Sequence, residues 1–181
     1  MKKLLIFIIG LPCSGKSTVA SKIAEKYGFI PFSTEAVRAE FLAGERDKKE
    51  DCDFTPEQHK LVYGEIIKRA RRILDSGRSV IIDGVYRSEA QRGEVFSLLD
   101  EYKGETPALC YWLTCAETET VRRLIKRKTE GTIAPAGIEG YKKISKEFAE
   151  PRLDIFKKLD TTEGTENILP LIYGDIASRF N

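Results

Sequence analysis

The chain has few side chains that could bind a metal through sulfur or imidazole. Its 181 residues include one histidine, His59, and four cysteines, and no two cysteines share a C-x-x-C spacing. Zinc sites and disulfide frameworks normally use closely spaced cysteines or histidines. The sequence therefore argues against both, and we expect reduced cysteines of the kind that cytoplasmic proteins carry.

Long hydrophobic runs and an excess of one charge are also missing. No apolar run approaches the roughly 20 residues that a membrane helix requires, and the stretch from Lys2 to Gly10 is too short for a signal peptide. Thirty basic and 28 acidic residues leave a net charge of +2. We therefore expect a cytoplasmic protein without a membrane partner, for which nucleic acid is a possible but not a favoured partner.

Apolar runs alternate with helix-like segments along the chain, a pattern typical of a parallel sheet wrapped by helices. The sequence predicts an α/β fold, a three-layer α/β/α sandwich around a five-stranded parallel sheet. The expected strands are residues 4–9, 29–32, 79–82, 108–113 and 155–159. The expected helices are residues 17–27, 55–75, 88–99 and 117–128.

Several of these helices carry end signals in the sequence. Gly28 is placed where a helix commonly ends in a left-handed residue. Thr55 can cap the next helix, with Pro56 at its first position and Gln58 completing a capping box. The segment 88–91, Ser-Glu-Ala-Gln, predicts a second capping box.

No linker or composition shift divides the chain, so we expect one domain over residues 1–181. Two segments, 43–54 and 131–140, have no clear helix or strand pattern. Long loops in compact domains are often functional, but solvated connectors fit the same composition. Both interpretations remain open.

A glycine-rich motif follows the first predicted strand directly. Residues 10–17, Gly-Leu-Pro-Cys-Ser-Gly-Lys-Ser, match G-x-x-x-x-G-K-[ST] at every fixed position. In such a loop backbone N–H groups surround a polyphosphate, and the helix behind points its positive end at the anion. Lys16 would reach the β- and γ-phosphates. The predicted nucleotide-binding residues here are Gly10, Pro12, Cys13, Ser14, Gly15, Lys16, Ser17 and Thr18.

An acidic residue ends the third predicted strand. Asp83 follows the apolar run Val-Ile-Ile, and the carboxyl end of a parallel strand opens into the ligand crevice of such folds. Together with the hydroxyl of Ser17, it could hold Mg²⁺. The sequence therefore predicts a metal site formed by Ser17 and Asp83.

At this point the chain resembles the P-loop kinases that include polynucleotide 5′-hydroxyl kinases, zeta-toxin-type kinases, gluconate kinase and chloramphenicol phosphotransferase. The resemblance implies a P-loop NTPase fold with a helical lid. It places the acceptor-binding segment at about residues 34–75 and the lid at about residues 117–148.

The second strand leads into Ser-Thr-Glu-Ala-Val-Arg, residues 33–38, which resembles the S-x-D-x-x-R element of polynucleotide-kinase-like members. The resemblance implies that Glu35 is the general base for the acceptor hydroxyl and that Arg38 binds acceptor phosphate. Glu35 replaces the aspartate of those relatives. Arg38 lies one helical turn further, so both side chains can face one cleft.

Further arginines follow from the same resemblance. Arg87 and Arg92, after Asp83, would lie on the acceptor side. Arg123 and Arg127 stand four residues apart and match the R-L-x-x-R lid pattern, with Arg127 as the catalytic arginine over the γ-phosphate and Arg123 as a nucleotide contact. The end of the last strand would border adenine, and the absence of an N-K-x-D motif favours ATP over GTP.

The function expected from the sequence is an ATP- and Mg²⁺-dependent kinase that transfers the γ-phosphoryl group to a hydroxyl-bearing acceptor. A small molecule is slightly favoured over a nucleic-acid 5′-hydroxyl, because the charges balance. A regulatory ATPase without an acceptor and a zeta-toxin-like sugar-nucleotide kinase are the alternatives. The sequence leaves the acceptor, the general base (Glu35 or Asp83) and the oligomeric state open.

Overall fold

The computed structural model describes residues 3–41, 54–130 and 137–180, the side chain of Phe180 excepted. Most of the segment 43–54, the first part of the segment 131–140, and Cys52 lie outside these residues. The elements, in chain order, are β1 (Leu5–Ile9), α1 (Lys16–Tyr27), β2 (Ile30–Ser33), α2 (Thr34–Phe41), α3 (Pro56–Asp75), β3 (Val80–Gly84), α4 (Glu89–Glu101), β4 (Ala108–Thr114), α5 (Glu117–Thr129), α6 (Ile138–Glu147), β5 (Lys157–Asp160) and α7 (Leu169–Phe180).

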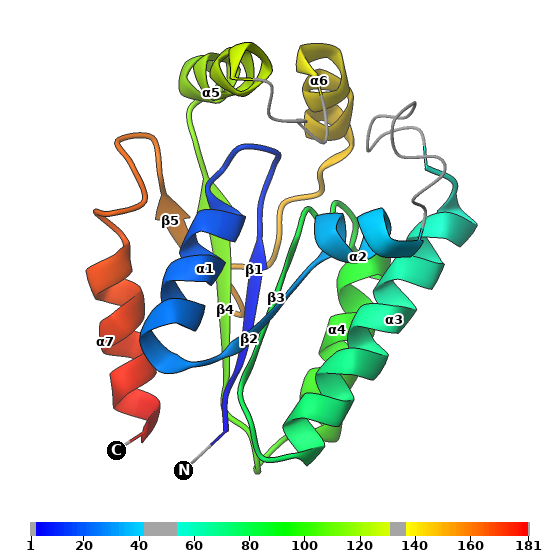
Figure 1. The fold of residues 1–181 in the computed structure, drawn as a ribbon, viewed down its shortest axis with the longest axis vertical. Helices are drawn as coiled ribbons and strands as arrows, with labels where there is room; N and C mark the ends of the chain where they lie inside the picture. Colours follow the sequence, from blue (N-terminus) through cyan, green and yellow to red (C-terminus); the bar gives the residue numbers. More distant parts are fainter. Residues whose placement is uncertain (1–2, 42–53, 131–136, 181) are drawn as a thin grey trace.

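A five-stranded sheet in the order β2-β3-β1-β4-β5 forms the middle layer, and every strand pair is parallel. Successive side chains of a strand point to opposite faces. Leu5, Phe7 and Ile9 pack with α3 and α4, whereas Ile6 and Ile8 pack with α1 and α7. Figure 1 shows these helix pairs on opposite sides of the sheet. The predicted three-layer α/β/α fold is confirmed.

Helix ends agree with the sequence in part. Gly28 ends α1 in the left-handed conformation, and Thr55 and Gln58 form the complete capping box that starts α3. Of the two hydrogen bonds in the second predicted capping box, only one is formed. Ser88 accepts the amide of Gln91, but the buried Gln91 Oε1 has no hydrogen-bond partner in the described part of the chain, so the return bond is absent.

Some elements were not predicted or were predicted with other bounds. Helix α6 begins at Ile138, inside the segment expected to be irregular, because Tyr141 and Ile144 pack inward. Helix α7, which buries Ile172 and Ile176, was not expected. Strand β5 starts two residues later than predicted, because the amide of Ile155 donates to the carbonyl oxygen of Arg152 and so forms a turn. None of the helices in residues 3–41, 54–130 and 137–180 has the length and apolar character to cross a bilayer.

Candidate active site

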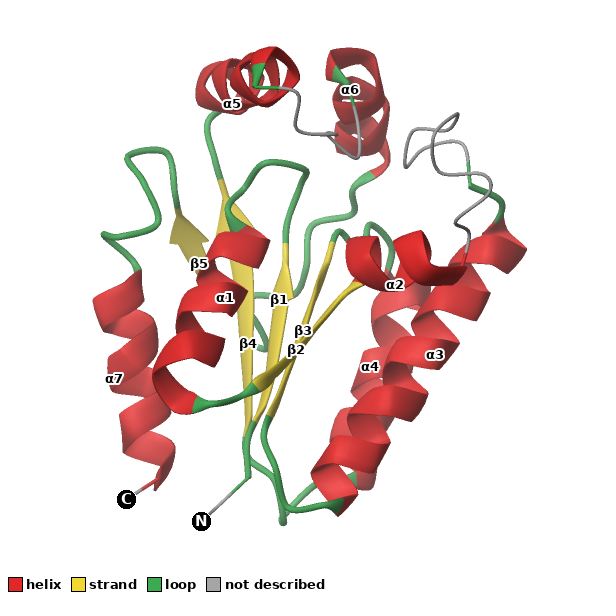
Figure 2. Ribbon diagram, in the orientation of Figure 1, coloured by secondary structure: helices red, strands yellow, loops and turns green. Residues whose placement is uncertain are grey.

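The candidate site lies at the carboxyl edge of the sheet, where the strand order reverses. From β1 the chain crosses to one side of the sheet, where β2 is the edge strand. From β3 it crosses to the other side, where β4 pairs with β1. In register, Asp83 of β3 lies between Ile8 of β1 and Ser33 of β2. Ligands of open parallel sheets bind at such a switch point. Figure 2 shows the loops after β1 and β3 and the start of α2 at this edge, with α5 and α6 beyond it.

The loop after β1 needs glycine at two positions. Gly10 has φ 155°, and a Cβ there would lie 2.3 Å from the carbonyl oxygen of Leu113. Gly15 has φ 85°, and a Cβ there would lie 2.6 Å from Thr165 Cγ2. Other residues rarely adopt these backbone angles. The two glycines therefore let the loop turn tightly and place the amino end of α1 at the cleft.

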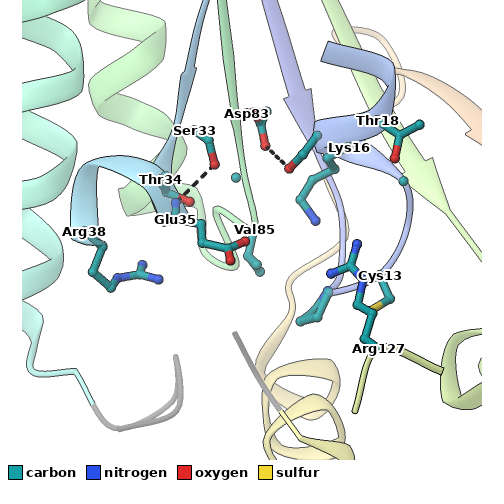
Figure 3. Close-up of a pocket in the computed structure, with 14 residues that line it drawn as sticks. Cys13, Lys16, Thr18, Ser33, Thr34, Glu35, Arg38, Asp83, Val85 and Arg127 are labelled. Carbon is teal, nitrogen blue, oxygen red and sulfur yellow. Dashed lines mark hydrogen bonds between the residues drawn. The ribbon is translucent and has the colours of Figure 1, made fainter. Parts of the chain in front are cut away.

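A cleft lies over this loop. Its walls come from the phosphate loop, the start of α2, the end of β3 and helix α5 (Figure 3). The lining residues are Pro12, Cys13, Gly15, Lys16, Ser17, Thr18, Ser33, Thr34, Glu35, Arg38, Asp83, Gly84, Val85 and Arg127. Of the eight predicted loop residues, six line the cleft. Gly10 lies in the turn below it, and Ser14 is buried and lines a neighbouring cavity instead.

Lys16 is the main cationic group of the phosphate loop. It is only 9% exposed, and its ammonium donates to the carbonyl oxygen of Leu11 at 2.8 Å. Figure 3 shows this ammonium extending into the cleft. The first N–H groups of α1 have no partners within the helix, and they add to the positive end of its dipole. The loop can therefore bind a polyphosphate anion.

Ser17 and Asp83 lie together, as predicted for a metal site. The Ser17 hydroxyl donates to Asp83 Oδ1 at 3.2 Å. Asp83 is 2% exposed, and burial raises the pKa of its carboxyl to about 6; Lys16 and the Ser17 hydroxyl oppose this shift, and Glu35 adds to it. The described residues contain no group of three or more metal-binding side chains. One hydroxyl and one carboxylate fit Mg²⁺, which usually keeps several waters and takes phosphate oxygens as further ligands.

The opposite wall comes from α2, which begins immediately after β2. The Ser33 hydroxyl accepts the amide of Glu35 at 3.2 Å and so shapes the first turn of the helix. Arg38 is 7% exposed, and its guanidinium lies 4.9 Å from the ring centroid of Phe54. Glu35 and Arg38 both point into the cleft across from Lys16 (Figure 3). The predicted acceptor pair and the predicted phosphate loop thus share one cleft.

The two arginines predicted to belong to a lid, Arg123 and Arg127, differ in their surroundings. Arg127 lines the cleft next to Cys13 (Figure 3). Arg123 does not line it. Its guanidinium binds Glu119 at 2.8 Å, the carbonyl oxygen of Cys13 at 3.2 Å and that of Thr161 at 2.5 Å. Arg123 therefore contacts the phosphate loop from outside the cleft.

Arg87 and Arg92 were predicted on the acceptor side, and the structure places both elsewhere. Arg87 pairs with Glu147 at 2.9 Å. Arg92 is 2% exposed and donates to the carbonyl oxygens of Tyr86, Arg87 and Ala149. Neither lines the cleft. Their guanidinium groups instead join the start of α4 to the end of α6 and to the segment after it.

Other cleft residues were missed at the sequence level. Thr34 and Gly84 approach closely: a Cβ on Gly84 would lie 2.6 Å from Thr34 Cγ2. Ser33 and Val85 complete this wall. Ser33 and Thr34 directly precede Glu35, and Gly84 and Val85 directly follow Asp83. Adjacency to the predicted base and metal ligand was therefore the signal that could have identified them.

Comparison with known proteins agrees with this geometry. Residues 5–151 match the AAA domain family. Adenylate kinase isoenzyme 1 of Gallus gallus is 34% identical over 137 residues, which are 71% of this chain and 67% of that protein. UMP-CMP kinase 2 of Oryza sativa subsp. japonica is 32% identical over 163 residues, covering 88% of this chain and 61% of that protein. A gluconokinase structure from Sinorhizobium meliloti 1021 shares the fold, with a TM-score of 0.70, 16% identity and 99% of both chains covered.

The sheet, the phosphate loop and the carboxylate beside it define a kinase-like P-loop NTPase, an enzyme of the phosphotransferase class. The chain belongs to the AAA domain family. The resemblance to P-loop kinases is confirmed. The chain spans about two thirds of the length of the two curated relatives named above.

Proposed function

We propose that the protein transfers the γ-phosphoryl group of ATP, in the presence of Mg²⁺, to a hydroxyl of a small anionic acceptor. The observation that carries the proposal is the shared cleft: the phosphate loop and Asp83 line one side, and Glu35 and Arg38 line the other. A regulatory ATPase would not require a carboxylate and an arginine in that position.

Each residue has a chemical role in this reaction. The phosphate loop and Lys16 bind the β- and γ-phosphates, and Ser17 and Asp83 hold Mg²⁺, which neutralises phosphate charge. Glu35 accepts the proton of the acceptor hydroxyl. As the bond from the acceptor oxygen to γ-phosphorus forms, the bond to the β,γ-bridging oxygen breaks and ADP leaves. Arg127 stabilises the negative charge of the transferred group.

Glu35 suits the base role better than Asp83 does. Asp83 is buried beside Ser17 and Lys16, so its carboxylate is committed to the phosphate side of the cleft. Glu35 extends from the acceptor wall toward the loop (Figure 3). A proton acceptor must lie within hydrogen-bonding reach of the attacking hydroxyl, and Glu35 is the carboxylate that lines the cleft on the side where we propose that the acceptor binds.

Arg38 supports an anionic acceptor. A guanidinium recognises carboxylate or phosphate through paired hydrogen bonds, and the position of Arg38 against Phe54 holds it at the cleft. The names of two curated relatives agree with an anionic acceptor, because adenylate, UMP and CMP are nucleotides that carry a negatively charged phosphate. The balanced charge of the whole chain gives no support to a long nucleic-acid acceptor.

The test is a transfer screen with γ-labelled ATP over nucleoside monophosphates, sugar acids, neutral sugars, aminoglycosides and 5′-hydroxyl oligonucleotides. The wild-type protein should label an anionic small molecule. Glu35→Gln should lower that transfer by roughly 10²–10⁴, the usual value of a positioned base, and leave ATP affinity unchanged. Label released only as inorganic phosphate, with every acceptor class, would contradict the proposal.

A further inference from the structure

Two carbonyl groups of the phosphate loop, those of Cys13 and Ser14, accept hydrogen bonds from side chains far along the chain. Thr161 follows β5 directly and has no exposed surface. Its hydroxyl lies 3.0 Å from the carbonyl oxygen of Ser14 in the loop and 3.0 Å from that of Thr114 at the end of β4. Its own amide also donates to the Thr114 carbonyl, at 2.8 Å. Thr161 is therefore tied to the sheet and contacts the loop from behind.

The contact with Ser14 decides the direction of one amide. The described chain has no cis peptide bond, and in a trans peptide the C=O of one residue and the N–H of the next point in opposite directions. Because the Ser14 carbonyl points to Thr161, the Gly15 N–H points away from Thr161. Gly15 lines the cleft and Thr161 does not, so this N–H is directed at the phosphate side.

A second tie comes from α5. Arg123 Nη1 donates to the Cys13 carbonyl oxygen at 3.2 Å and lies 3.4 Å from Thr161 Oγ1, while Glu119 holds the other edge of the guanidinium. Two consecutive carbonyl groups of the loop, those of Cys13 and Ser14, are thus held on the outside. Arg123, expected from the sequence to contact the nucleotide, belongs to this outer set in the structure.

We propose that Thr161 is a positioning residue for the phosphate loop, whose buried hydroxyl, assisted by Arg123, keeps the Ser14 carbonyl turned outward and the Gly15 N–H directed at bound phosphate. The inference rests on the proposed function only in that the loop binds a polyphosphate. It requires a hydroxyl at position 161, so serine can replace threonine and valine cannot. Loss of this hydroxyl should weaken the binding of phosphate, and this loss should not depend on Glu35, the proposed general base.

The experiment measures binding by calorimetry with two probes, ATP and inorganic tripolyphosphate, each with Mg²⁺. Thr161→Val keeps the shape of the side chain and removes the hydroxyl. It should weaken both probes by a similar factor of about 10, the value of one hydrogen bond to a charged group. Thr161→Ser should stay within about threefold of wild type. Thr106→Val is the control, a buried threonine before β4 whose hydroxyl has no partner among the described residues.

The outcomes separate this inference from the proposed function. A wild-type protein that binds neither probe would contradict the proposed function itself. Wild-type affinity of folded Thr161→Val for tripolyphosphate, or a loss for ATP alone, would overturn the role of Thr161 and leave the kinase proposal standing. If Thr161→Val does not fold, Thr161→Ala takes its place. A tenfold loss in the serine variant, which keeps the hydroxyl, would overturn the inference in any case.

Discussion

Replacing Asp83 by asparagine should make the protein more stable in the absence of ligands, although it removes a group needed for function. Asp83 is 2% exposed, and its pKa is raised to about 6 from an ordinary value of 3.8, chiefly by burial. The folded state therefore favours the protonated carboxyl. Asparagine has the same shape, carries no charge and can keep the hydrogen bond with Ser17.

The magnitude follows from the pKa difference. Each pKa unit corresponds to about 1.4 kcal/mol, so ionising Asp83 in the folded state costs up to about 3 kcal/mol. The sign follows from linkage. Below about pH 4 the carboxyl is protonated in both states and the cost is absent. The cost grows as pH rises from about 4 to about 6, and it is complete above that range. At pH 8 the variant should gain about 1–3 kcal/mol, and at pH 4 nothing.

Thermal denaturation without nucleotide or metal provides the assay. For a chain of this size about 1 kcal/mol moves the melting temperature by roughly 2–4 °C, so the gain at pH 8 should be roughly 2–12 °C. Added Mg²⁺ and ATP should stabilise the wild type more than the variant, because a ligand stabilises the folded protein in proportion to its binding and the variant lacks the carboxylate that we propose holds Mg²⁺. The control is Asp154→Asn, an exposed aspartate whose pKa is lowered by the hydrogen bond from Arg152. An Asp83→Asn gain that persists at pH 4, or no gain at pH 8, would refute the reasoning.

Three further predictions concern the loop, the base and a buried arginine. Gly15→Ala should abolish ATP binding, because Gly15 has φ 85° and a Cβ would meet Thr165 at 2.6 Å; Gly93→Ala, in the open interior of α4, should instead raise stability by about 1 kcal/mol in a melt. Glu35→Asp, which withdraws the carboxylate by one methylene, should retain more transfer than Glu35→Gln in the labelled-ATP assay, and equal rates would place the base elsewhere. Arg92→Met should destabilise the protein by roughly 3 kcal/mol in denaturant unfolding, because it leaves buried carbonyl groups without a donor; unchanged ATP affinity of the folded protein would confirm that Arg92 lies outside the site.

The parts of the site that depend on local backbone geometry could be predicted from the sequence. The glycines of the loop over residues 10–17 have backbone angles that other residues rarely adopt, and Asp83 lies next to the end of β3, which pairs directly with β1. The fold class could be predicted because the alternation of apolar runs and helix signals is also a local property of the sequence. In these cases the contacts that matter lie within a few residues or between neighbouring strands.

The long cationic side chains could not be assigned in this way. An arginine can reach a cleft, a carboxylate or a buried carbonyl from one backbone position, and tertiary contacts decide which. Arg92 satisfies three carbonyl groups and Arg123 holds the Cys13 carbonyl, whereas Arg127, one turn beyond Arg123, lines the cleft. The start of helix α6 at Ile138 was not predicted, because Gly137, which precedes it, has no side chain that could cap the helix.

We propose that the loop over residues 10–17 binds the phosphates of ATP through Lys16, and the affinity of Lys16→Ala for ATP with Mg²⁺ is the decisive measurement. Lys22→Ala, an exposed lysine of the same helix that pairs with Glu25, is the matched control. Lys16→Ala should bind ATP roughly tenfold more weakly or worse, because a buried cation at the phosphates is lost, and it should transfer no label. Lys22→Ala should behave as wild type. Wild-type ATP affinity and wild-type transfer in folded Lys16→Ala would show that the loop does not bind ATP through this lysine.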